Sequence, residues 1–379
     1  MTQDIDGILA QAAGEAGLPG VVAIAANRDG IIHQAAIGER SPGVAMTVDS
    51  VARIHSMTKA LTSTAALMMV ERGLLSLDAP IREVLPELSA PMVFKRFDGD
   101  TPVLRPAKTP ITLRQLLTHT AGYGYDTWNE PQGRLMAALG LPRIPTSVDE
   151  LRRMPLMFEP GTRWNYGVNT DVVGRAVEVA SGKTLEAVLH DEIFAPLGMA
   201  DTMFVTQFDQ EARRILMHRR KADGAVTPAP FPPPEFLPFM AGGGGLHSTA
   251  VDYIKFLQAV LAGGAALLGS EMFGVLTTAQ SGDITVQPMI TAIPSMSNDV
   301  FLYPDMAVKW SGGFMVNTAV TAEGRSAGGL AWAGLCNAYY WIDLSRGTCG
   351  VFLAQLLPFA DPATLAAFRA YETAVNALN

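Results

Sequence analysis

The chain has 379 residues, of which 49% are hydrophobic and 17% charged, so it can bury a large core and is not a disordered protein. Its formal net charge of −8 argues against a general nucleic-acid-binding protein, which usually has a basic surface. No apolar run approaches the roughly 18 residues of a membrane span. The acidic N-terminal segment predicts no signal peptide. Two isolated cysteines, Cys336 and Cys349, are expected to be buried reduced thiols in a cytoplasmic protein.

The N-terminal segments predict a helix, a hairpin and a longer helix. Apolar residues at helical spacing indicate a short amphipathic helix over residues 4–16. The β-rich runs 21–26 and 31–37 are separated by Asn-Arg-Asp-Gly, which is typical of a hairpin turn. A long helix is expected from about Ser56 to residue 72, where Gly73 stops it.

The middle of the chain is Pro-rich and mostly helical in pattern. Its helices are expected at residues 113–117, 148–154, 171–181 and 185–193. The proline-dense stretch 228–238 predicts an extended surface loop, or flap, rather than a domain linker. A run of four glycines ends this stretch, and a further helix is expected over residues 250–261.

The C-terminal third is β-rich and indicates the fold class. Runs 313–320, 330–342 and 348–356 predict three consecutive antiparallel strands, and Asp361-Pro362 begins a final helix. Strands at both ends with helices between predict an α/β fold of the α+β type, with an antiparallel sheet built from both termini and flanked by helices. We expect one domain over residues 1–379. Its α/β part comprises residues 1–79 and 239–379, and residues 80–238 form a helical insertion with the flap.

A serine and a lysine stand three residues apart at the start of the long helix, in Ser56-Met57-Thr58-Lys59. Positions i and i+3 share a helix face, so the hydroxyl and the amine would lie side by side. An amine withdrawn from water can activate a serine, and a helix N-terminus favours developing negative charge. Taken alone, the tetrapeptide fits a helix-capping serine beside an exposed lysine equally well.

A second serine lies in Gly324-Arg325-Ser326-Ala327-Gly328, which matches the nucleophile elbow of α/β-hydrolases. That elbow needs a strand before it and a helix after it, and here strand-like runs stand on both sides. It also needs a later histidine, but the last one is His247. We therefore predict that Ser326 lies in a turn.

Cofactor sites are not indicated. The six histidines have no metal-ligand spacing, and the glycine run lacks the lysine of a phosphate-binding loop, so we expect neither a metal nor a nucleotide cofactor. One basic cluster is interpreted as a solvated helix face; its members are Arg213, Arg214, Arg219, Arg220 and Lys221.

Several separated motifs agree with one known family. They are Ile54–Thr62 around the serine, Glu71–Pro80, Ile111–Gly122, Phe158–Tyr166 and Ala241–Ser248. Together they resemble the serine β-lactamase-like superfamily. The similarity is closest to class C β-lactamases and their esterase relatives, the family VIII carboxylesterases, and the group includes fungal statin acyltransferases. The resemblance runs from about residue 10 to 357 and is weakest over residues 277–308.

The resemblance implies a set of site residues. The catalytic serine and lysine correspond to Ser56 and Lys59, and the tyrosine of a Tyr-x-Asn motif corresponds to Tyr166, with either Lys59 or Tyr166 as the base. It also implies an oxyanion hole from the backbone amides of Ser56 and Leu335. The Lys-Thr-Gly motif of the family corresponds to Trp332-Ala333-Gly334.

Two departures from the β-lactamase pattern bear on the substrate. Val168 replaces the asparagine and Trp332 replaces the lysine that help to hold a β-lactam, and family VIII esterases typically carry such a Trp-x-Gly motif. The resemblance therefore implies a serine carboxylesterase for neutral small or medium esters. An acyltransferase of the same fold is the nearest alternative, and a β-lactamase, a D-peptidase or a non-catalytic binding protein are further ones. An apolar, uncharged cleft is expected around Trp332, Gly334 and Val168, with aromatic walls from Tyr123, Tyr125, Trp128, Phe231 and Phe236.

Overall fold

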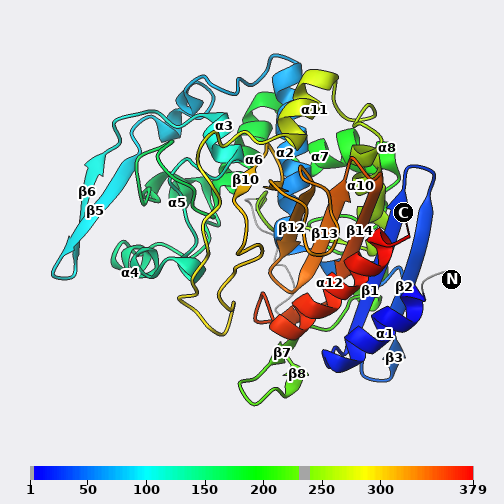
Figure 1. The fold of residues 1–379 in the computed structure, drawn as a ribbon. Coiled ribbons are helices and arrows are strands. Elements are labelled where there is room, and N and C mark those ends of the chain that lie inside the picture. The colour runs from blue at the N-terminus through cyan, green and yellow to red at the C-terminus, as the bar shows by residue number, and fades with distance from the viewer. Residues whose placement is uncertain (1–3, 230–239, 379) are drawn as a thin grey trace.

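An eight-stranded antiparallel sheet, to which both ends of the chain contribute, forms the centre of the molecule. The computed structural model describes residues 4–229 and 240–378. The strand order is β10-β11-β12-β13-β14-β1-β2-β3 (Figure 1). The prediction of an antiparallel sheet built from both termini is therefore confirmed. Its strands are β1 (Gly20–Asn27), β2 (Ile31–Ser41), β3 (Val44–Ala45), β10 (Val308–Trp310), β11 (Met315–Asn317), β12 (Leu330–Gly334), β13 (Ala338–Asp343) and β14 (Thr348–Leu353).

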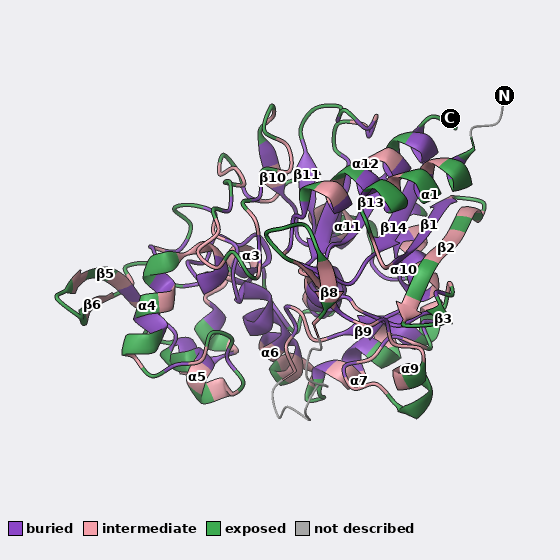
Figure 2. Cartoon of the chain, turned by 90° about the horizontal axis from the view of Figure 1, so that it is seen from below, coloured by how far each residue is buried: buried purple, intermediate pink, exposed green. Residues whose placement is uncertain are grey.

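The predicted N-terminal hairpin joins β1 to β2. In its turn the Asn27 side chain accepts hydrogen bonds from the amides of Asp29 (2.8 Å) and Gly30 (3.0 Å), as asparagine does in tight turns. Strand β1 is an inner strand and is buried almost throughout, which explains its continuous apolar sequence, whereas β2 is partly exposed (Figure 2).

The prediction of a single strand over residues 330–342 is wrong. This segment forms two strands, β12 and β13, which pair with each other through a turn at Leu335, Cys336 and Asn337. Asn337 has a φ of 56°, a left-handed conformation that asparagine tolerates better than most residues. The turn is mostly buried and begins with two apolar residues, so its sequence resembles the strands around it. Four strands of this sheet, β11 to β14, therefore follow β10, not three.

Helices cover both faces of the sheet. Helices α1 (Ile5–Glu15) and α12 (Pro362–Asn376) pack together on one face, and α10 (Ala250–Leu261) lies against β1, β13 and β14 on the other (Figure 1). The predicted start of α12 is confirmed, because the Asp361 carboxylate accepts a hydrogen bond from the Thr364 amide at 2.9 Å. Helix α2 (Thr58–Glu71), which follows the 3₁₀ turn His55–Met57, contacts α6 (Asn169–Ser181) and α11 (Ser270–Thr277).

The segment between α2 and β9 carries the other helices, several of which begin or end at the predicted residues. It also contains an unpredicted hairpin, β5–β6, that projects away from the sheet (Figure 1). Its helices are α3 (Leu113–Leu117), α4 (Glu130–Ala138), α5 (Val148–Arg153), α6 (Asn169–Ser181), α7 (Leu185–Leu189), α8 (Ala195–Leu197) and α9 (Phe208–Ala212). Its strands are β5 (Met92–Asp98), β6 (Thr101–Pro106), β7 (His218–Arg220) and β8 (Val226–Pro228). The short strands β4 (Ala52–Arg53) and β9 (His247–Ser248) pair with each other, and β15 (Leu356–Leu357) pairs with β7.

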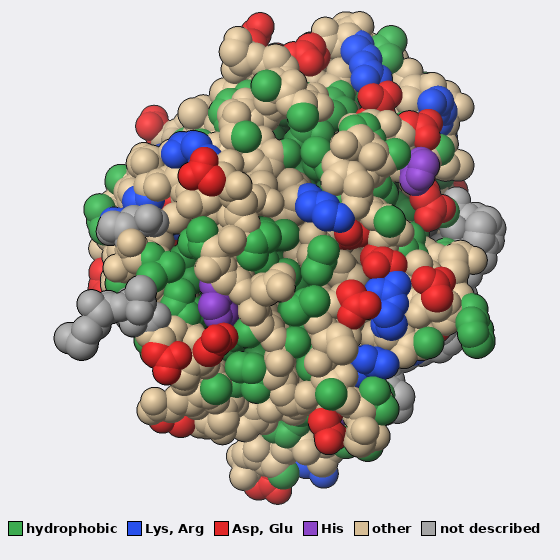
Figure 3. Space-filling view, turned by 90° about the vertical axis from the view of Figure 1, so that its right-hand side faces the viewer, with side chains coloured by type: hydrophobic (Ala, Val, Ile, Leu, Met, Phe, Trp, Pro, Cys, Tyr) green, Lys and Arg blue, Asp and Glu red, His purple; other side chains and the backbone are tan. Residues whose placement is uncertain are grey.

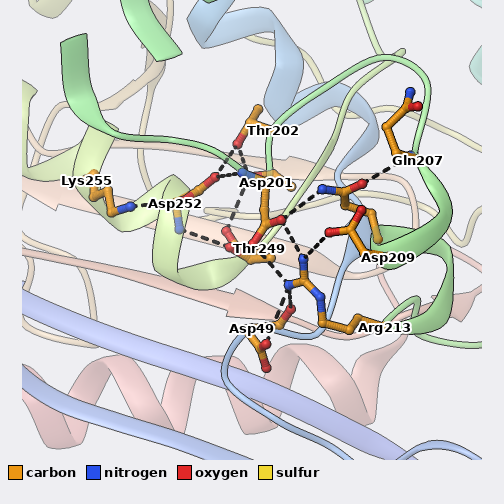
Figure 4. A network of polar contacts seen from close by, with 11 residues as sticks. Asp49, Asp201, Thr202, Gln207, Asp209, Arg213, Thr249, Asp252 and Lys255 are labelled. Atoms are coloured by element: carbon orange, nitrogen blue, oxygen red, sulfur yellow. Dashed lines mark hydrogen bonds and ion pairs between the residues drawn. The ribbon is translucent and has the colours of Figure 1, made fainter. Parts of the chain in front are cut away.

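The basic cluster is not a helix face, contrary to the prediction. Arg213 follows α9 and pairs with Asp201 at 2.5 Å, within a polar network that also includes Asp49 and Asp252 (Figure 4). Arg219 and Arg220 lie in β7, and Arg220 pairs with Asp361 at the start of α12. These arginines connect segments that are far apart in the chain.

The surface carries charges of both signs. On the face seen in Figure 3, Lys and Arg side chains lie among Asp and Glu side chains, without an extended area of one sign. Within residues 4–229 and 240–378, no helix has both the length and the apolar character that crossing a membrane requires.

Candidate active site

Ser56 lies in the 3₁₀ turn that precedes α2, and Lys59 lies in the first turn of that helix. The Lys59 Nζ atom donates to the Ser56 Oγ atom at 3.2 Å, so the predicted contact between the two side chains is present. Ser56 is partly exposed, whereas Lys59 is only 2% exposed. The serine therefore faces a cavity while the amine is enclosed by protein.

Two further oxygens surround the Lys59 amine. Its Nζ atom donates to the Gly243 carbonyl at 2.6 Å and to the Tyr125 hydroxyl at 3.2 Å. With Ser56 Oγ, three acceptors match the three N–H donors of a charged ammonium group. Gly243 belongs to the glycine run, so that run supplies a backbone carbonyl to the site.

Tyr166 lies against both Lys59 and Trp332. The Trp332 indole Nε1–H donates to the Tyr166 hydroxyl oxygen at 2.9 Å, and the Lys59 Nζ atom lies 4.7 Å from the centre of the tyrosine ring. Both groups place partial or full positive charge beside Tyr166. Trp332 thus provides a hydrogen-bond donor to the tyrosine.

Tyr125 was expected only as part of an aromatic wall, but its hydroxyl also contacts the Lys59 amine directly. Glycines 124 and 167 approach so closely that a side chain on Gly167 would collide with the Gly124 backbone, and the Tyr125 amide donates to the Tyr166 carbonyl at 3.1 Å. The Tyr125 hydroxyl reaches Lys59, and burial raises the pKa of Tyr125 well above its ordinary value, so it remains a neutral phenol. The repeated Gly-Tyr at residues 122–125 is the sequence signal for this approach.

A buried carboxyl group, which the sequence analysis did not single out, lies next to the lysine. The Asp171 side chain in α6 is fully enclosed and accepts a hydrogen bond from the Gly243 amide at 3.1 Å. Burial raises the pKa of Asp171, and the positive charge of nearby Lys59 offsets part of that increase. His119, which contacts the Tyr166 ring, is held neutral because burial and Lys59 both lower its pKa.

The two predicted oxyanion-hole residues are brought together by a close approach of backbones. A side chain on Gly334 would collide with the Ile54 carbonyl, so only glycine allows the end of β12 to lie against the turn that carries Ser56. Leu335 follows directly, and both Ser56 and Leu335 line the same cavity. This arrangement can present two backbone amides to one oxygen atom.

The cavity beside Ser56 has a volume of about 530 Å³ and a mostly apolar lining. Of the predicted substrate-binding residues, Tyr125, Trp128, Trp332 and Gly334 line it. The prediction for the remaining two described residues is wrong: Tyr123 and Val168 are buried in the core instead of lining this cavity. Phe231, Phe236 and most of the proline-rich stretch lie outside the described residues.

The expectation of an uncharged cleft needs a correction, because charged side chains also line the cavity. Arg143 forms an ion pair with Asp126 at its edge. Arg53 lies near Ser56, and burial lowers the pKa of its guanidinium group. The apolar lining comes from other residues, among them Ile144, Val205, Met240, Met296 and Phe359.

Ser326 lies in the connection between β11 and β12, as predicted, and does not line the cavity of Ser56. Its amide donates to the Asp343 carboxylate at 2.7 Å, which fixes the turn through the backbone rather than the hydroxyl. We therefore expect Ser326→Ala to retain more than half of any esterase activity. A loss as large as that of Ser56→Ala, in a folded protein with an unchanged unfolding temperature, would contradict this assignment.

The family is shown by comparison with known proteins. The β-lactamase family model matches residues 5–374. The chain belongs to the β-lactamase family. The expected similarity to esterases and acyltransferases of this family is confirmed by the following relatives.

Two relatives and one solved structure illustrate the branch. The chain is 31% identical to the lovastatin esterase of Penicillium rubens over 329 residues, which cover 84% of this chain and 82% of the relative. It is 32% identical over 360 residues to the monacolin J acid methylbutanoyltransferase of Aspergillus terreus, with coverages of 88% and 83%. A mutant (LovD6) of simvastatin synthase LovD from the same fungus has a TM-score of 0.85, at 28% identity, over 99% of this chain and 94% of that one. Relatives at this similarity include both an esterase and an acyltransferase.

Proposed function

We propose that this protein is a serine carboxylesterase that hydrolyses neutral esters with small or medium acyl groups. The observation that carries the proposal is that Ser56 and Tyr166 line one cavity while the buried Lys59 amine lies against both of them, with the Trp332 indole N–H on the tyrosine hydroxyl. A nucleophile, an adjacent base and a group that orients the base form the usual arrangement for acyl transfer.

In the first half of the reaction, Ser56 Oγ attacks the ester carbonyl carbon and its proton passes to the base, which is either the Tyr166 phenolate beside a cationic Lys59 or the Lys59 amine in its neutral form. The carbonyl oxygen gains negative charge, which the amides of Ser56 and Leu335 stabilise. The bond to the alcohol oxygen then breaks, the alcohol leaves with the proton, and the acyl group stays on Ser56. Water loses a proton to the same base, attacks the acyl carbon and releases the carboxylic acid with the serine hydroxyl restored.

Trp332 supports the choice of neutral esters. Where β-lactamases present a lysine, this chain presents an indole that buries apolar surface and has no charge for a substrate carboxylate. At about 25 cal/mol per Å² of buried apolar area, the lining of the cavity favours uncharged acyl and alcohol groups. Arg143 is already paired with Asp126, which leaves it less suited to an anionic substrate.

The second candidate is an acyltransferase, and it is favoured by the similarity to the methylbutanoyltransferase. Such an enzyme would use the same acyl-enzyme and pass the acyl group to an alcohol instead of water. The two are separated by incubating the acylated protein in buffer with and without an added alcohol. If free acid is released at the same rate in both mixtures, the protein is a hydrolase. If the acyl-enzyme is stable in buffer and yields a new ester when the alcohol is added, the protein is an acyltransferase.

The test of the proposed function is intact-protein mass spectrometry after mixing with p-nitrophenyl esters of increasing chain length. A mass increase of one acyl group on the wild-type protein, absent from Ser56→Ala, is the expected result. The chain length that gives the fastest p-nitrophenol release then measures the acyl preference. If no ester acylates the protein and no p-nitrophenol is released above the buffer rate, the proposal is wrong.

Changes at Trp332 separate its two roles. Trp332→Phe keeps a ring but removes the N–H that stabilises charge on Tyr166. A hydrogen bond to a charged group contributes about 1.5–3 kcal/mol, so kcat/KM for a neutral ester should fall roughly 10- to 100-fold. Trp332→Lys restores a donor and adds a cation, which should raise the activity towards a cephalosporin relative to the neutral ester.

The measurement for these variants is kcat/KM for one neutral p-nitrophenyl ester and one cephalosporin on all three proteins. The hypothesis predicts that the wild-type protein prefers the neutral ester. A wild-type preference for the cephalosporin would contradict the role of Trp332 in selecting neutral esters. Wild-type kinetics in Trp332→Phe would contradict the role of its N–H in catalysis.

A further inference from the structure

One contact between buried side chains lies beside the candidate oxyanion hole and has no part in the mechanism above. The Cys336 Sγ atom and the His55 Nε2 atom are 3.1 Å apart, and both residues are buried. His55 immediately precedes Ser56, and Cys336 immediately follows Leu335. Each partner is therefore one peptide unit away from one of the two proposed oxyanion donors.

We infer that the His55–Cys336 contact is a positioning pair, which holds the amides of Ser56 and Leu335 at the separation that a developing oxyanion requires. This inference rests on the proposed function, because it concerns the same acyl transfer. It assigns a role to Cys336, which does not line the cavity, and a positioning role to His55, which lines the cavity next to Ser56. Their effect on catalysis is transmitted through the backbone of the neighbouring residues.

The Cys336 end of the contact is anchored independently of Ser56. Its side chain is fully buried in a small apolar cluster with Met217 and Leu357, and its carbonyl accepts a hydrogen bond from the Leu356 amide at 3.1 Å. Strand β15, which contains these two leucines, pairs with β7. These contacts hold the Cys336 thiol in place next to Leu335.

The His55 end needs such an anchor, because its backbone has a φ of 46°. This left-handed conformation is uncommon for a residue with a side chain, although histidine adopts it more often than most, and contacts with the surroundings stabilise it. Ser56 follows directly, so relaxation of the His55 backbone would rotate the peptide unit that carries the Ser56 N–H. The close approach of Gly334 to Ile54 brings the end of β12 next to the turn that carries Ser56. The contact between the Cys336 thiol and the His55 imidazole is a second link between the same two segments.

The chemistry of the pair excludes a second nucleophile. Burial raises the pKa of Cys336 to about 12, and burial is also the main cause that lowers the pKa of His55 well below its ordinary value. The pair is therefore a neutral thiol and a neutral imidazole, which form a hydrogen bond without transfer of charge. A reactive cysteine would need the opposite shift, towards a stable thiolate.

The test measures how fast a p-nitrophenyl phosphonate labels Ser56, followed by intact-protein mass. In this reaction Ser56 Oγ forms a bond to phosphorus, p-nitrophenolate leaves, and the phosphoryl oxygen occupies the oxyanion hole. We expect Cys336→Ala to slow labelling by about 10- to 100-fold, the effect of a misplacement of about 1 Å in a catalytic group. His55→Asn, which tolerates a left-handed backbone, should slow it to a similar extent.

Cys349→Ala is the matched control. Cys349 is also a free and fully buried thiol, but it lies in β14 opposite Ala26 and does not line the cavity. It should lose comparable stability in thermal unfolding and keep the wild-type labelling rate. Cys336→Ser, which keeps a donor for His55, should recover part of the rate lost in Cys336→Ala.

A double-variant cycle completes the test. If the pair acts as one unit, Cys336→Ala combined with His55→Asn should be no slower than the slower single variant. Wild-type labelling by folded Cys336→Ala, or losses that multiply in the double variant, would overturn the inference. If Cys336→Ala does not fold, Cys336→Ser and its double variant with His55→Asn take its place in the cycle. Absence of labelling in the wild-type protein would instead count against the proposed function.

Discussion

Replacing Ser56 with alanine is expected to abolish ester turnover, with a fall in kcat of roughly 10³-fold or more. The reason is that the acyl group is transferred to the Ser56 Oγ atom, which alanine lacks. The adjacent Lys59 amine is enclosed by protein and cannot replace the serine as the nucleophile. The measurement is the steady-state rate with a neutral p-nitrophenyl ester, together with the mass of the protein after incubation.

Thermal unfolding of Ser56→Ala provides the control, because Ser56 is partly exposed and its loss should leave stability nearly unchanged. Ser326→Ala serves as the second control, since it removes a hydroxyl from a turn on the same chain. Wild-type turnover by a folded Ser56→Ala protein would refute the proposed mechanism as a whole.

Lys59→Ala and Tyr166→Phe are each expected to reduce the rate of acylation by about 10³-fold, and the double variant should be only slightly slower than either. The two side chains act on one proton, and the Lys59 Nζ atom lies 4.7 Å from the Tyr166 ring centre. Removing either one therefore disables the same proton transfer. The measurement is the single-turnover rate of acylation, by the release of p-nitrophenol.

The unfolding temperature of each variant shows whether its loss of rate comes from a lost catalytic group or from a damaged fold. Lys59→Ala leaves the Gly243 carbonyl and the Asp171 carboxyl without their positive neighbour, so a lower unfolding temperature is expected for it. Tyr166→Phe removes only the acceptor of the Trp332 N–H and should unfold closer to the wild-type temperature. Small losses of rate that multiply in the double variant would indicate that the two residues act separately.

Local sequence patterns predicted much of the fold. The apolar periodicity of α1 and α12, the turn residues between β1 and β2, and the glycine after α2 all act within a few residues, so the sequence records them directly. The hairpin β5–β6 was missed. Its sequence alternates weakly and includes several charged residues, because both of its strands are only partly buried.

The division of residues 330–342 into β12 and β13 could not be read from hydrophobicity. Cys336 and Asn337 are buried and Leu335 is partly buried, and such a turn needs fewer of the polar residues that mark an exposed one. Val168 illustrates the same limit for the site. Its place in the family motif suggested a cavity wall, yet the start of α6 directs it into the core.

By itself, the sequence determined the elements that depend on neighbours in the chain: the helix that sets Ser56 beside Lys59, the N-terminal hairpin, and the strand-rich C-terminus. Only the tertiary structure decided what surrounds them. Lys59 meets the Gly243 carbonyl across 184 positions, Trp332 meets Tyr166 across 166, and Cys336 meets His55 across 281. Helix and turn preferences arise from local backbone sterics and hydrogen bonds, whereas these contacts arise when the sheet and the helices pack and bury their shared surfaces.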